Sequence, residues 1–215
     1  MNKKMMILGL AVVSAVAVAF SAGASAQEIH LTNVTSSVGT FGNSTFTAKE
    51  EPVTTCEGPN HITTTTSTGG TTGTIHIDYT NCHTNVGGFT IKCRTAGSAL
   101  DNTTTFSGVW HFITFNEKPA ILVTPEHTTV ICAGISNDTL TGNIIGTITS
   151  PACGVASTKM TIKFSATGPT QEHKSYTGVN YNLTSQTGTG GTIKEAGLAS
   201  ETTIESPTAG TLDCT

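Results

Sequence analysis

The chain has 215 residues, of which 11% are charged, and a formal net charge of −4 at neutral pH. With so few charges and no basic cluster to neutralise phosphates, we expect no nucleic-acid partner. Threonine and glycine are abundant and helix-forming residues are scarce, which favours strands because threonine is branched at Cβ. The composition therefore predicts an all-β protein.

Residues 1–26 have the pattern of an export signal. Lys3 and Lys4 precede an apolar run from Met5 to Phe20, and small residues at 24–26 form a cleavage site. The alternative, a membrane anchor, is disfavoured because the run is short for a span of about 20 residues. We therefore predict a secreted or cell-surface protein with no membrane contact after cleavage, made of a single all-β domain over residues 27–215.

Six cysteines lie after the predicted signal: Cys56, Cys82, Cys93, Cys132, Cys153 and Cys214. An even number in an exported chain predicts three disulfides and leaves no thiol nucleophile. Two of the predicted bridges, Cys82–Cys93 and Cys132–Cys153, join sequence neighbours across a turn. The third, Cys56–Cys214, follows from the closeness of domain termini.

Period-two alternation marks the strands in chain order. From Thr72 to Thr80, Ile75, Ile77 and Tyr79 are predicted to face inward. The segment from Phe106 to Phe115 is apolar on both parities and is expected to be covered on both sides. Further strands are expected near residues 29–34, 41–46, 53–56, 61–66, 89–93, 120–124, 139–149, 160–165, 179–184, 202–204 and 211–214.

One helical turn is predicted over Lys194 to Leu198, amid about ten to twelve short strands with frequent turns. This pattern is typical of an antiparallel β-sandwich or a flattened barrel.

The stretch from Thr141 to Cys153, TGNIIGTITSPAC, carries a resemblance. It resembles a loose group of exported proteins of high-GC Gram-positive bacteria, across roughly Phe106 to Phe164. They are similar in an Ala-rich signal, a Thr/Gly-rich body, paired cysteines and a Gly-Xaa-Ile-Gly-Xaa-Ile-Thr-like strand before a cysteine. The resemblance implies a secreted, disulfide-bonded all-β protein and implies no activity.

Histidines provide the first candidate chemistry. His76 and Asp78 share one strand face and His83 follows, so the three could ligate a metal. A solvated outer face explains the same alternation, and we predict no metal and no cofactor. His111 is expected to be partly buried and hydrogen-bonded.

The acids Glu117, Glu126, Asp101 and Asp138 all fall in predicted turns. Carboxylates in turns are usually solvated, and the separation that a glycosidase pair requires cannot be derived from sequence. Motifs for a nucleophile elbow, a zinc protease or a phosphate loop do not occur, so we predict no catalytic residues.

These observations favour a non-catalytic extracellular module that binds a wall polymer, a glycan or another surface protein. The alternative is a secreted hydrolase whose acid and histidine residues are assembled from loops. Two acids in one pocket would favour the hydrolase, as would convergence of three of His76, Asp78, His83, His111 and His127.

Overall fold

The computed structural model describes residues 28–98 and 100–215. The predicted signal lies outside these residues. The described chain consists of strands and turns, and its twenty strand segments pair antiparallel throughout. The all-β prediction is confirmed.

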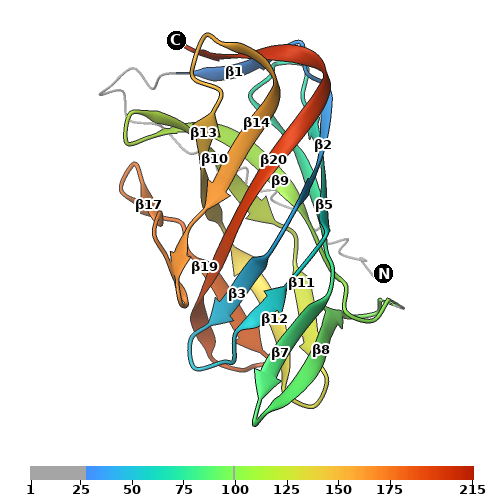
Figure 1. Cartoon of the computed structure of the whole chain (residues 1–215). Coiled ribbons are helices and arrows are strands. Elements are labelled where there is room, and N and C mark those ends of the chain that lie inside the picture. The colour runs from blue at the N-terminus through green and yellow to red at the C-terminus, as the bar shows by residue number, and fades with distance from the viewer. Residues whose placement is uncertain (1–27, 99) are drawn as a thin grey trace, which may run out of the picture.

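The strands close into two rings stacked end to end (Figure 1). We call them the upper and the lower ring, as they stand in Figure 1. The upper ring is formed by β2 (Ser36–Phe41), β5 (Asn60–Thr66), β6 (Thr72–Tyr79), β9 (Thr104–Phe115), β10 (Lys118–Pro125), β13 (Ile144–Ser150), β14 (Ala156–Phe164) and the later part of β20 (Ile193–Cys214).

The lower ring has the matching order around its circumference. It is formed by β3 (Ser44–Ala48), β4 (Thr54–Cys56), β7 (Cys82–Val86), β8 (Phe89–Thr95), β11 (Thr128–Cys132), β12 (Ser136–Gly142), β19 (Leu183–Thr187) and the first part of β20. Along the chain, each upper strand is joined to the lower strand that lies in line with it, and β14 and β19 are joined through a longer excursion. Eight long paths therefore run up and down one elongated barrel.

Most of these paths break at the waist, where the rings meet, and side chains bridge the breaks. Asn60 is fully buried, donates from Nδ2 to Gly42 O at 2.5 Å, and accepts from Thr80 N at 2.8 Å. Asn81 donates to Gly58 O at 2.6 Å. Buried backbone groups must find partners, and at the waist these amides replace the missing ladder bonds.

Segments outside the rings cover an end and a side. β1 (Ile29–Thr32) pairs with the last residues of β20. The excursion between β14 and β19 contains two small hairpins, formed by β15 (Ala166–Thr167) with β16 (Thr170–Gln171) and by β17 (Ser175–Tyr176) with β18 (Val179–Asn180).

This excursion explains why Phe106 to Phe115 is apolar on both faces. Tyr176 and Tyr181 pack on the outer side of the sheet against a cluster containing Ile113 and Ile145. Trp110, which points inward, belongs to the main core. The prediction that this strand is covered on both sides is confirmed only for its last residues, because Val109 and His111 on the outer face are exposed.

The structure confirms some of the other sequence predictions and contradicts others. Ile75, Ile77 and Tyr79 are buried, as expected. The helical turn predicted over Lys194 to Leu198 is wrong, because these residues lie in β20 and pair with β19. Of the two predicted architectures, the barrel is supported and the sandwich is not, since both rings close, and the described residues form twenty strand segments rather than ten to twelve.

All six cysteines are paired, which confirms three disulfides, but the predicted connectivity is wrong. The bridges are Cys56–Cys82, Cys93–Cys132 and Cys153–Cys214. Cys153 and Cys214 staple the upper end of the barrel, where Cys214 lies opposite Ile29 of β1.

The register of the lower ring explains this pairing. Cys56 lies opposite Cys82, and Cys93 lies opposite Cys132. Extending the β7–β8 register by one residue places Cys82 opposite Cys93, so four cysteines form one row. A Cys82–Cys93 bridge would leave Cys56 and Cys132 about 14 Å apart, three strand spacings, which is beyond the reach of a disulfide. Pairing from the two ends of the row bridges all four.

The Cys153–Cys214 bridge should contribute strongly to stability because it closes a loop with a sequence separation of 61 residues. Replacing both cysteines by alanine should lower the free energy of unfolding by roughly 4 kcal/mol in the chain-entropy model. Urea unfolding measures this change, and non-reducing peptide mapping tests the connectivity. A peptide joining Cys82 to Cys93 would contradict the pairing of Cys56 with Cys82 and of Cys93 with Cys132.

Candidate functional site

A groove crosses the outside of the upper ring, where β2 meets β20. These strands pair over only two positions, Val38 with Glu205 and Gly39 with Ile204. Their backbones approach so closely that a Cβ at Gly39 would collide with the backbone oxygen of Thr203. A concavity of about 910 Å³ lies over this junction.

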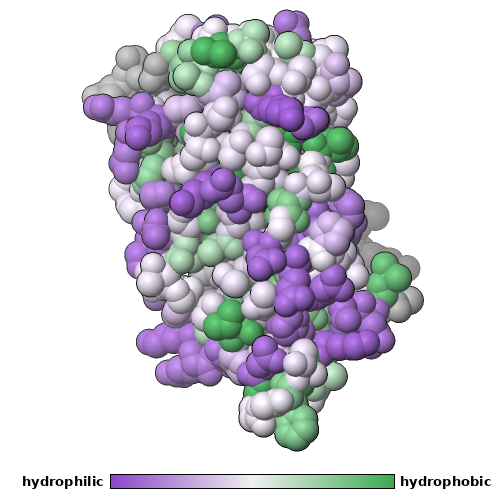
Figure 2. All heavy atoms as spheres, in the orientation of Figure 1, coloured by the Kyte–Doolittle hydropathy of each residue, from purple (hydrophilic) through white to green (hydrophobic). Residues whose placement is uncertain are grey.

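Five of the twelve residues that line this groove carry neutral hydroxyl groups. Thr161 and Thr203 lie opposite each other on β14 and β20, with their Oγ1 atoms 2.8 Å apart. Thr40 and Thr63 line the β2–β5 side. β20, β2 and β14 lie on the face towards the viewer in Figure 1, and Figure 2 shows hydrophilic, near-white and scattered hydrophobic residues over that face.

Charged residues stand at the two ends of the groove. Lys159 Nζ lies 2.6 Å from Glu205 Oε1 in an exposed ion pair. At the other end His61 lies opposite Asp78 on β5 and β6. Val38 contributes an exposed apolar surface, 58% accessible, between them.

The strand register arranges outward-facing side chains in one row that follows the curved wall of the upper ring across six strands. In order, its members are Ser107, His76, Thr63, Val38, Glu205 and Lys159, each opposite the next. With strands about 4.8 Å apart, the row extends for roughly 24 Å. An extended ligand could therefore contact several strands at once.

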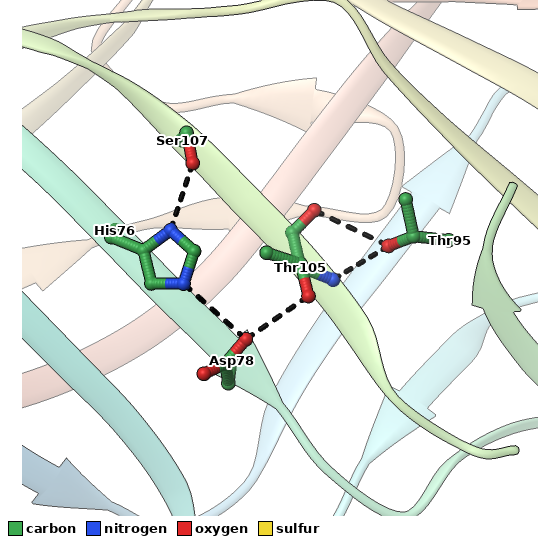
Figure 3. Close-up of polar contacts among 5 residues, drawn as sticks. All are labelled: His76, Asp78, Thr95, Thr105 and Ser107. Atoms are coloured by element: carbon green, nitrogen blue, oxygen red, sulfur yellow. Dashed lines mark hydrogen bonds and ion pairs between the residues drawn. The ribbon is translucent and has the colours of Figure 1, made fainter. Parts of the chain in front are cut away.

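One end of this row brings a serine, a histidine and an aspartate together (Figure 3). His76 Nδ1 lies 2.8 Å from Ser107 Oγ, and His76 Nε2 lies 3.6 Å from Asp78 Oδ1. The side chains of His76 and Asp78 are 50% and 42% exposed. The prediction that these two share an outer face is confirmed.

Asp78 is held in place from the neighbouring strand. Thr105 Oγ1 donates to Asp78 Oδ1 at 3.0 Å, and the backbone N–H of Thr105 donates to Thr95 Oγ1 at 2.6 Å (Figure 3). This chain of hydrogen bonds fixes the carboxylate beside the imidazole. Sequence reasoning did not find Ser107 or Thr105, because their contact with β6 depends on the strand register.

The arrangement could move a proton from Ser107 to His76, with Asp78 stabilising the imidazolium. Acyl transfer also requires N–H donors aimed at the developing oxyanion. Ser107 stands within β9, between β6 and the end of β10, where backbone N–H groups bond to neighbouring strands. The geometry therefore fits a hydrogen-bonded polar cluster better than it fits a hydrolytic site.

The other predicted candidates lie apart from this cluster. His83 contacts the backbone oxygen of Asn81, with Nδ1 at 3.1 Å. His111 was expected to be partly buried, but it is exposed, because its parity on β9 faces outward. His127 is exposed in the turn between β10 and β11. Within residues 28–98 and 100–215, no group of three or more potential ligands could hold a metal.

Asp138 was predicted in an exposed turn, and this is wrong. It belongs to β12 and is 5% exposed inside the lower ring. Thr187 Oγ1 donates to Asp138 Oδ1 at 2.8 Å and lies 3.3 Å from Glu51 Oε1. Lys194 Nζ lies 2.9 Å from that same oxygen of Glu51 and 3.8 Å from Glu50 Oε2.

Two acids therefore converge in the lower end of the barrel, with a lysine beside them. Sequence analysis missed this cluster because Glu51 lies in a turn and Lys194 was assigned to a helix. The hydrogen bond to Glu51 raises the pKa of Lys194. The acids are thus engaged by a cation and a hydroxyl, and the cluster closes the barrel end with satisfied polar groups.

Searches against protein-family models, curated proteins and solved structures find no match to this chain. The described part of the chain also has no helix with the length and apolarity of a membrane span. Function must be inferred from the geometry of the molecule itself.

Stability should fall at alkaline pH for two reasons. The folded pKa of Lys194 lies above its unfolded value near 10.5, so its contribution is present below that pH and is lost as pH rises through the folded pKa. Burial raises the pKa of Tyr79, so above about pH 10 ionisation favours the unfolded chain. Lys194→Met and Tyr79→Phe should each flatten this loss in urea unfolding between about pH 9 and 12, whereas Lys163→Met, at an exposed site, should not. Unchanged slopes in both variants would contradict this account.

Proposed function

We propose that this chain is an exported, non-catalytic β-domain that binds a polar polymer, such as a glycan of the cell envelope, in the outer groove. The observation that carries the proposal is the continuous row of side chains across six strands. Its hydroxyl-rich neighbourhood can donate to and accept from the hydroxyl groups of a polymer. The groove runs across the strands, so a linear chain would contact β5, β2, β20 and β14 in turn.

Export supports the same proposal. Residues 1–26 have the pattern of a secretion signal, and the three disulfides suit an oxidising extracellular compartment. A mature chain starting at Gln27 would meet wall polymers outside the cell. Its polymer contacts would come from neutral hydroxyls such as those of Thr40 and Thr63, together with the exposed ion pair of Lys159 and Glu205.

Binding can be tested with lysine substitutions that fill the groove. Thr40→Lys and Thr203→Lys should each weaken binding to soluble envelope glycan fragments at least tenfold, measured by NMR titration of the mature domain. Thr90→Lys, at an exposed threonine on β8 outside the groove, is the matched control. If glycan fragments shift no groove resonance, or if all three variants bind alike, the proposal is wrong; binding of a protein partner instead would also overturn it.

The contact between Ser107, His76 and Asp78 favours one alternative, a secreted hydrolase. In that case the mature protein should hydrolyse activated esters, and Ser107→Ala should lower kcat/KM at least 10³-fold. Ser36→Ala, at an exposed serine on β2, should leave the rate unchanged. Hydrolysis that Ser107→Ala does not reduce would exclude this site, and so would a failure to turn over ester and peptide panels.

A further inference from the structure

The wall of the barrel is interrupted beside β20 at the waist. β2 pairs with β20 at Glu205 and Ile204, and β3 pairs with residues 196–199 of β20. Between these two ladders, residues 200–203 have no strand partner on that side in the described chain, because the path from β2 to β3 is broken at residues 42–43. A hollow of about 470 Å³ lies over this interruption, and we call it the waist hollow.

The walls of the waist hollow come from three parts of the barrel. Asn43 and Thr45 lie at the start of β3, Lys163 and Ser165 lie at the end of β14, and Glu201 lies on β20 between them. β14 and β3 pair with opposite sides of β20, on the face towards the viewer in Figure 1. The waist hollow and the outer groove therefore share this face.

The outer groove and the waist hollow also share the ladder formed by β14 and β20. Three outward-facing pairs follow one another along this ladder: Lys159 opposite Glu205, Thr161 opposite Thr203, and Lys163 opposite Glu201. The first two pairs line the groove, and the third lines the hollow. Ile162 and Thr202, which lie between the second and the third pair, are buried. No side chain of this ladder therefore separates the two concavities.

The charged residues of the waist hollow are available to a ligand. Lys163 and Glu201 are exposed, and neither makes an ion pair within the described chain, in contrast to the bonded pair of Lys159 and Glu205. Glu172 also lines the hollow, is exposed and has no ion-pair partner there. These groups can donate to and accept from a polar ligand.

We propose that the waist hollow is a second subsite of the polymer site, so that one polar chain extends from the outer groove along the β14–β20 ladder to the waist. This inference rests on the proposed function. From Thr63 to Lys159 the groove crosses three strand spacings, about 14 Å, and the ladder from Lys159 to Ser165 adds about 20 Å. The ligand is a flexible polymer, and a short fragment of it fills only part of the site.

The dependence of affinity on ligand length tests the second subsite. The probe is one pool of soluble envelope glycan fragments, separated into fractions shorter than about 15 Å and longer than about 35 Å, which match the groove and the whole path. In NMR titrations of the mature domain, the long fraction should bind roughly tenfold more tightly or better, because its second contact is made intramolecularly. It should shift the amide resonances of both Thr203 and Glu201.

Asn43→Lys isolates the contribution of the waist hollow. Asn43 is exposed and lines the hollow but not the outer groove, so a longer side chain there obstructs the second subsite alone. This variant should lose the gain from length without weakening the short fraction. Asn180→Lys, at an exposed asparagine of β18 that lines neither concavity, is the matched control and should keep the gain.

The outcomes separate this inference from the proposed function. Equal affinities of the short and the long fractions would overturn the second subsite and leave the outer groove as the binding site. A gain from length that Asn43→Lys leaves unchanged, or that Asn180→Lys removes equally, would also overturn it. If no fraction binds, the proposed function is wrong and the second subsite is wrong with it.

Discussion

The closure of the sheet by β20 is the constraint on which the rest of this structure depends. An open antiparallel sheet exposes two edges of unpaired backbone groups. β20 removes these edges, because it pairs with β14 and β19 on one side and with β2 and β3 on the other. It has 22 residues and runs unbroken through both rings, whereas the other paths of the described barrel are interrupted at the waist. Closure by one strand leaves little freedom for the register of the others.

That register places side chains in rows, and both notable rows follow from it. Inside the lower ring it aligns four cysteines; outside the upper ring it aligns Ser107, His76 and the groove residues. The contact between His76 and Ser107 arises because they are directly opposite on β6 and β9 with outward parity. A serine and a histidine in such positions can bond whether or not they catalyse a reaction.

Much of the upper ring was predictable from local pattern. Met160, Ile162 and Phe164 alternate with polar residues and are buried as their spacing indicates. Features that depend on which strands are neighbours were not predictable. Sequence proximity favoured Cys82–Cys93, but the outcome depends on the flanking positions of Cys56 and Cys132. Alternation predicted the shared face of His76 and Asp78, but not the proximity of Ser107, 31 residues away in the chain.

Threonine has opposite consequences on the two sides of the wall. On the outer side, opposed threonines on neighbouring strands bond to each other, as Thr65 does with Thr74 and Thr161 with Thr203, and water can reach what remains. On the inner side, Thr104 and Thr202 have no partner in the described chain, so their hydroxyls remain a cost to folding.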